Sequence, residues 1–109
     1  MKVNILGTKY AIFEKDRHKD EILKSADGYC DHSTKVIVIL KRPPDCEIGD
    51  FEEYRKKVLR HEIIHAFLFE SGLRENFKHD EWGHDEIFVD WVACQFPKIL
   101  EVYKKVGCI

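Results

Sequence analysis

Two histidines and a glutamate stand close together near the middle of the chain, in the segment His61-Glu62-Ile63-Ile64-His65. In a helix, residues four apart lie on one face about 6 Å apart, so the two imidazoles can converge on one metal ion. Glu62, one position round the helix, can reach a water molecule bound to that ion. Zinc with three protein ligands keeps an open position, lowers the pKa of bound water to about 7 and polarises a carbonyl. The pattern therefore predicts amide hydrolysis, with Glu62 as general base.

The surroundings of the two histidines favour a metal. They lie in an otherwise apolar stretch of the predicted helix, where an unpaired imidazole would cost desolvation free energy that metal binding removes. Two interpretations compete with a working zinc site. The histidines could simply hydrogen-bond to neighbouring groups, or the site could be folded and catalytically inactive. The apolar neighbours are Ile63, Ile64, Ala66, Phe67 and Leu68.

A third ligand must come from further along the chain. The elongated signature of the metzincins would require glycine at position 68 and histidine at position 71, where this chain has Leu68 and Ser71. We predict Glu86, because it opens a helical pair in which Asp90, one turn on, can hydrogen-bond the second nitrogen of a ligand histidine. His84 is the alternative and would give a three-histidine site. All candidates in this stretch are His79, Asp80, Glu81, His84, Asp85 and Glu86.

Two segments, 59–67 and 86–97, together resemble the ImmA/IrrE family of small zinc metallopeptidases. In that family the signature helix is followed by a second helix that begins with the third-ligand glutamate and closes in a proline-terminated apolar stretch. The resemblance covers about half the chain. It implies that His61, His65 and Glu86 bind zinc and that Glu62 is the catalytic base. It also implies a phage or mobile element as the source and a helix-turn-helix repressor as substrate. A SprT-like peptidase, with a related fold and a third histidine, would favour His84.

The first part of the chain predicts strands. Residues 2–13 alternate loosely around Gly7, which indicates a strand pair or one bent strand. Residues 16–24 predict a short helix with Ile22 and Leu23 as its buried edge. Residues 28–40 predict a hairpin that ends in a well-buried strand, Val36–Leu40, which the following prolines terminate. In compact zinc peptidases of this type an edge strand beside the signature helix pairs with an extended substrate, and Val36–Leu40 is our candidate; the alternative is an ordinary core strand.

The second part predicts helices. Asp50 can cap a long helix from about Phe51 to Ser71, with Gly72 just past its end. The apolar side chains in the C-terminal half of this helix occupy more than one face, so we expect that half to be buried. A further helix is expected over residues 85–94, and Pro97 suits the first turn of a last helix that runs to Lys105 and ends at Gly107.

Composition limits the classes of protein. A chain of 109 residues has room for one domain, which we place at residues 1–109. The net charge of −2 provides no basic field for direct nucleic-acid binding. No apolar run approaches the roughly 18 residues of a membrane-spanning helix, and no signal peptide is apparent, so we expect a cytoplasmic protein with no membrane contact. The four cysteines form no CxxC pair and are expected to be reduced.

These features predict an α+β domain in which a small, mostly antiparallel sheet packs on the long metal-binding helix, a minimal zincin-like metallopeptidase fold. The predicted function is a zinc-dependent metallopeptidase, with Zn²⁺ as cofactor and a protein or peptide as substrate. One alternative is a non-catalytic zinc-binding regulatory or interaction protein that keeps the fold, and another is a zinc hydrolase of non-peptide amides. Candidates for stabilising the oxyanion are Tyr29, His32, Tyr54 and His79.

Overall fold

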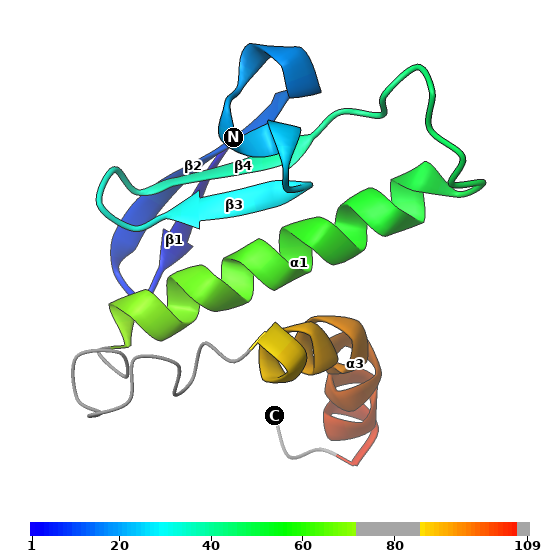
Figure 1. Cartoon of the computed structure of the whole chain (residues 1–109). Helices are drawn as coiled ribbons and strands as arrows, with labels where there is room; N and C mark the ends of the chain where they lie inside the picture. Colours follow the sequence, from blue (N-terminus) through cyan, green and yellow to red (C-terminus); the bar gives the residue numbers. More distant parts are fainter. Residues whose placement is uncertain (72–85, 107–109) are drawn as a thin grey trace.

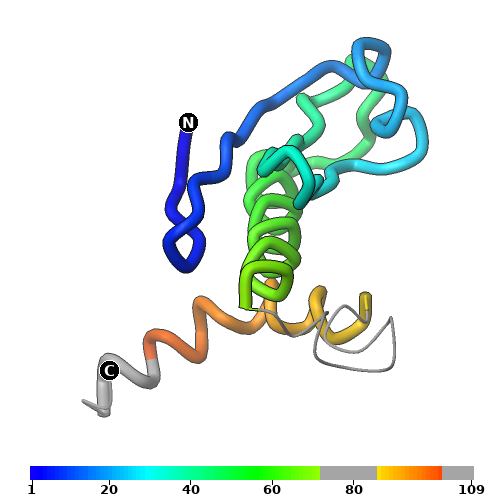
Figure 2. Tube along the Cα trace, turned by 90° about the vertical axis from the view of Figure 1, so that its left-hand side faces the viewer, coloured from blue at the N-terminus to red at the C-terminus, as the bar shows by residue number. Residues whose placement is uncertain are grey.

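The computed structural model describes residues 1–71 and 86–106, with side chains up to residue 101. Over these residues the fold is α+β, with a four-stranded mixed sheet and two α-helices, α1 (Phe51–Glu70) and α3 (Glu86–Val106). Helix α1 lies between the sheet and α3 (Figure 1), and the perpendicular view shows α3 crossing beneath α1 (Figure 2). Neither helix, as far as it is described, has the length and apolar character of a membrane span.

The sheet has the strand order β1-β2-β4-β3, with β1 (Lys2–Ile5), β2 (Thr8–Lys15), β3 (Gly28–Asp31) and β4 (Val36–Leu40). The β1–β2 and β3–β4 pairs are antiparallel, which confirms the predicted strand pair and hairpin. Strands β2 and β4 pair in parallel, so the sheet is mixed, and this pairing was not predicted.

Strand β4 is an inner strand, and the prediction that it forms an edge is wrong. It lies between β2 and β3. Ile37 and Ile39 pack into the core cluster that also contains Ala66 of α1, whereas Val38 and Leu40 pack with Leu23 in a second cluster. A strand buried on both faces reads as a continuous apolar run, as this one does. The edge strand on this side of the sheet is β3.

The segment between β2 and β3 forms two short 3₁₀ helices in place of the single helix that we predicted. These are η1 (Arg17–Lys19) and η2 (Ile22–Lys24). Asp20 between them is extended, and its carboxylate accepts a hydrogen bond from the N–H of Ile22. Leu23 is fully buried as expected, but Ile22 is half exposed, because a 3₁₀ turn of three residues presents only one side chain to the sheet.

Helix α1 begins as predicted. The Asp50 carboxylate accepts a hydrogen bond from the N–H of Glu53 at 3.0 Å and so caps the first turn. The helix ends at Glu70, with Ser71 as its C-cap, and Gly72 lies outside the described residues. The C-terminal half of α1 is only partly buried, in contrast to the expectation: Glu62 and Ala66 are buried there, whereas Phe67 is 40% exposed.

One continuous helix, α3, replaces the two helices that we predicted for this region. It is continuous from Glu86 to Val106, with Pro97 inside it rather than at a new start. Figure 1 shows the axis of α3 changing direction along its length, and an internal proline is the usual cause of such a bend. Gly107, the predicted end, lies outside the described residues. Among the described cysteines, Cys30, Cys46 and Cys94 are free.

Candidate metal centre

Helix α1 places His61, Glu62 and His65 on the side that faces the cleft. The Nε2 atoms of the two histidines lie 3.2 Å apart, so the i, i+4 spacing brings both rings to one point. The two imidazoles are largely buried, with side-chain exposures of 17% and 13%. Burial lowers the pKa of His65, which favours the neutral imidazole that a metal ion requires.

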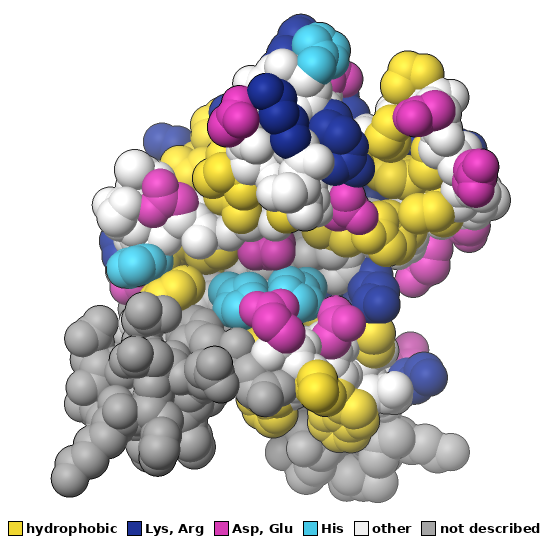
Figure 3. Space-filling view, viewed as in Figure 1, with side chains coloured by type: hydrophobic (Ala, Val, Ile, Leu, Met, Phe, Trp, Pro, Cys, Tyr) yellow, Lys and Arg dark blue, Asp and Glu magenta, His cyan; other side chains and the backbone are white. Residues whose placement is uncertain are grey.

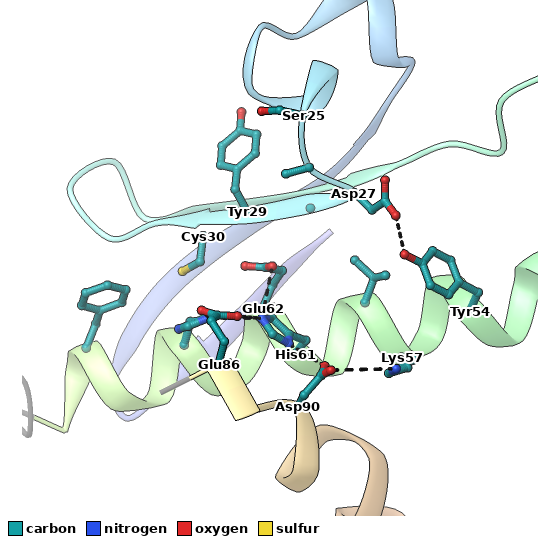
Figure 4. A pocket seen from close by; sticks show the side chains of 15 residues that line it. Ser25, Asp27, Tyr29, Cys30, Tyr54, Lys57, His61, Glu62, Glu86 and Asp90 are labelled. Carbon is teal, nitrogen blue, oxygen red and sulfur yellow. Dashed lines mark hydrogen bonds and ion pairs between the residues drawn. The ribbon is translucent and has the colours of Figure 1, made fainter. Parts of the chain in front are cut away.

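Helix α3 brings Glu86 to the same point from its first residue. One carboxylate oxygen, Oε2, lies 2.9 Å from Nε2 of His61, and the other, Oε1, lies 3.0 Å from Nε2 of His65. His61, His65 and Glu86 therefore form a cluster whose ligand atoms all lie within 4.8 Å of one another. Figure 4 shows Glu86 at the start of α3 beside His61 of α1.

Asp90 follows Glu86 by one helical turn and contacts the opposite side of His61. Its Oδ1 atom lies 2.9 Å from Nδ1 of His61, which is the contact that the sequence pattern predicts. Its Oδ2 atom lies 4.0 Å from the amine of Lys57, which precedes His61 by one turn on α1. When Nδ1 of a neutral His61 donates to Asp90, Nε2 presents its lone pair toward Glu86 and His65.

The three donors fit a zinc ion. With zinc–ligand bonds of about 2.0–2.2 Å, a tetrahedral site separates neighbouring ligand atoms by about 3.3 Å. The two Nε2 atoms lie 3.2 Å apart, and a different oxygen of Glu86 lies near each of them, 2.9 Å from His61 and 3.0 Å from His65. A turn of the Glu86 carboxylate would bring one of its oxygens to both histidines. If Nδ1 of a neutral His61 donates to Asp90, its Nε2 lone pair would face the Glu86 carboxylate, an arrangement that a cation would stabilise. Two histidines and one carboxylate are a ligand set of catalytic zinc sites.

Glu62 is the buried acid of this centre. It is 7% exposed, and one of its oxygens lies 4.0 Å from Nε2 of His61. Burial raises the pKa of its carboxyl to about 7, against a lowering effect of His61 and with a smaller raising effect of Glu86. A carboxyl with a pKa near neutrality can accept and return a proton at the pH of a cell.

Gly28 of β3 lets the edge strand approach α1 beside Glu62. A Cβ atom at this position would lie 2.7 Å from Cγ1 of Val58 and 3.4 Å from Cγ of Glu62. The first distance is too short for a side chain, so only glycine permits this approach. The close approach of the strand contributes to the burial that raises the pKa of Glu62.

A cleft of about 700 Å³ lies in front of these groups. Its walls include edge strand β3 on one side and the start of α3 on the other, with α1 between them. In the space-filling view the histidine side chains lie at the centre of this face, with acidic side chains above and below them (Figure 3). A peptide that entered the cleft would therefore pass between β3 and the candidate metal ligands.

The four candidates for oxyanion stabilisation have different surroundings. The Tyr29 hydroxyl donates a hydrogen bond to Asp20 at 2.7 Å, and the Tyr54 hydroxyl donates one to Asp27. His32 stacks on Phe69 with ring centroids 4.2 Å apart. The hydroxyl groups of both tyrosines therefore already donate to carboxylates. His32 is not among the described residues that line the cleft. The predicted residues outside the described ranges are His79, Asp80, Glu81, His84 and Asp85.

Two residues near the centre were not predicted as part of it. Gly28 gave no signal in the sequence, because its role depends on how closely β3 packs on α1. Lys57 was not singled out in the sequence, although it lines the cleft beside Asp90. Its position one turn before His61 was the available signal.

No protein-family model matches the chain, and no curated protein or solved structure matches it either.

Proposed function

We propose that this chain is a zinc-dependent metallopeptidase with a minimal zincin-like fold. The observation that carries the proposal is the convergence of His61, His65 and Glu86 beside the buried carboxyl of Glu62. The ligand set and the base come from two helices that are distant in sequence, and both line one open cleft. The resemblance to the ImmA/IrrE family, drawn from the same residues, supports the same function.

The chain's own groups have separate tasks in this proposal. His61, His65 and Glu86 would hold the metal ion, which when bound makes water acidic and polarises a carbonyl. Glu62 would take a proton from the attacking water and return it to the leaving amine. Asp90 fixes the ring orientation of His61 through Nδ1.

Strand β3 supplies a place for the substrate backbone. It pairs with β4 along one edge, and no strand of the described residues pairs with its other edge. Gly28, Tyr29 and Cys30 of this strand line the cleft, so its free edge runs beside the candidate ligands. An extended peptide can add to such an edge through main-chain hydrogen bonds. A regulatory protein such as a helix-turn-helix repressor is the substrate that the family resemblance suggests.

Replacement of the base tests the enzymatic function. We expect Glu62→Gln to reduce peptide cleavage by about 10²–10⁴-fold, because the general base is lost while the ligands remain. The assay uses zinc-loaded protein and a library of unstructured peptides, with cleavage read by mass spectrometry and zinc content measured in parallel. Glu47→Gln, which changes an exposed acid outside both helices, is the control.

Two results would count against a peptidase. Equal cleavage by the Glu62→Gln variant and the parent would mean that Glu62 is not the base. A parent protein that binds zinc and cleaves none of the peptides would favour the alternative of a non-catalytic zinc-binding regulatory protein. Cleavage of small amides without cleavage of peptides would instead favour a non-peptide hydrolase.

A further inference from the structure

Pro97 leaves one backbone carbonyl of α3 without its helical partner. In an α-helix the N–H of each residue bonds to the carbonyl four residues earlier, and proline has no N–H. Since Pro97 lies inside α3, the carbonyl that loses its partner is that of Ala93. Ala93 is fully buried, and a buried carbonyl without a hydrogen bond is costly.

Arg60 of α1 supplies the missing donor. Its Nε atom donates a hydrogen bond to the carbonyl oxygen of Ala93 at 2.7 Å. The Nη2 atom at the far end of the same guanidinium lies 3.9 Å from the Glu53 carboxylate, two turns earlier on α1. The guanidinium therefore connects α1 to the one carbonyl of α3 that Pro97 deprives of its helical bond.

This link lies close to the candidate metal ligands on both helices. On α1, Arg60 directly precedes His61, and on α3, Ala93 follows Asp90 by three residues and Glu86 by seven. Seven residues are about two turns, so Glu86 and Ala93 lie on the same face of α3. The bond uses no group of the metal centre, so it can hold α3 against α1 before any metal binds.

We propose that Arg60 is a positioning residue for the metal centre, which sets the place of Glu86 and Asp90 by binding the carbonyl that Pro97 leaves open. The inference rests on the proposed zinc site. Its physical basis is that Glu86 begins α3, so its distance from the histidines depends on how α3 is held against α1. Without the link, zinc binding must also bring α3 into place, and the affinity falls.

The test compares two uncharged replacements of Arg60. In Arg60→Gln the side-chain nitrogen Nε2 is as many bonds from the backbone as Nε of arginine, so a donor to Ala93 is kept. In Arg60→Met the corresponding atom is a methyl group. Zinc affinity is measured by competition with a chromophoric chelator. Arg55→Met, which removes an arginine paired with Glu14 and Glu52, is the control.

We expect Arg60→Met to weaken zinc binding by roughly tenfold or more, the effect typical of losing a group that orients ligands. Arg60→Gln and the control should remain close to the parent. Equal zinc affinities for the Met and Gln variants would overturn the inference. A parent that binds no zinc would instead remove the metal site itself, so the two failures are distinguishable.

A second measurement covers the case in which Arg60→Met folds poorly. Pro97→Ala restores an N–H that can bond to the Ala93 carbonyl within α3, so Arg60 should no longer be needed there. We expect Arg60→Met to lower the thermal midpoint of the metal-free protein by several degrees, and to lower it far less in the Pro97→Ala background. An equal loss in both backgrounds would show that Arg60 does not act through this carbonyl.

Discussion

Asp90 and Glu86 contact different atoms of the same imidazole. Asp90 accepts from Nδ1 of His61, while Glu86 faces Nε2 at 2.9 Å. The Nδ1 contact fixes the tautomer and the ring plane, which leaves Nε2 for a metal ion. His61 is thus oriented from α3, and the candidate centre depends on both helices.

The identity of the third ligand can be tested at single residues. We expect Glu86→Gln to weaken zinc binding by more than the roughly 10–100-fold that is typical of losing an outer partner, because a ligand is lost. His84→Ala should leave the affinity unchanged. Competition with a chromophoric chelator measures both variants. If His84→Ala abolished binding and Glu86→Gln did not, the centre would have three histidine ligands.

Residue types and spacing predicted that His61, His65 and Glu86 come together, as they do in the structure, and their binding of a metal ion stays a prediction. The separation of His61 and His65 by four residues, and of Glu86 and Asp90 by four, places each pair on one helix face whatever the rest of the chain does. The burial of Glu62 is different, because it depends on the approach of β3 at Gly28. A contact between a helix and a strand thirty residues earlier leaves no periodic signal in either segment.

Among the elements, β4 and α3 differ most from what the sequence predicts. The sequence offers Val36–Leu40 as an edge strand or as a core strand, and the structure has the core strand, because a continuous apolar run is typical of a strand covered on both faces. The sequence predicts a helix start at Pro97, because proline is favoured in a first turn. The structure keeps it within α3, where Arg60 bonds to the carbonyl that proline leaves open. That bond joins residues far apart in sequence, and local propensity does not report it.

Glu70 connects the C-terminal end of α1 to the sheet region through hydrogen bonds. Its carboxylate accepts hydrogen bonds from Lys35 at 2.6 Å, from the Tyr10 hydroxyl at 2.7 Å and from the Thr8 hydroxyl at 3.0 Å. These bonds lower the pKa of Glu70 from 4.5 to about 2. The resulting stabilisation is complete above the unfolded-state pKa and is lost as the pH falls toward about 2.

We therefore expect Glu70→Gln to lower the free energy of unfolding at pH 7 by about 1–2 kcal/mol, since charge-assisted bonds are lost from a partly exposed site. The difference from the parent should shrink as the pH falls below about 4.5. Urea unfolding at several pH values measures it, with Glu101→Gln on the exposed side of α3 as control. A difference independent of pH would mean that the charge of Glu70 is not responsible.

At the scale of the whole molecule, α1 contacts both the sheet and α3. The side of α1 near Ala66 packs into the core cluster formed with the sheet, and its His61 and His65 meet Glu86 of α3. The catalytic proposal needs both contacts, because the sheet buries Glu62 and α3 provides the third ligand. Distortion of either contact should therefore affect the centre without any change in its own residues.

The central claim is that the side chains of His61, His65 and Glu86 hold one zinc ion. The most direct test is a crystal of the protein with one equivalent of zinc, examined by anomalous scattering at the zinc edge. The account predicts one peak per chain, within about 2.0–2.2 Å of Nε2 of His61, Nε2 of His65 and a carboxylate oxygen of Glu86. A peak bound by other residues, or none between these three side chains, would contradict it.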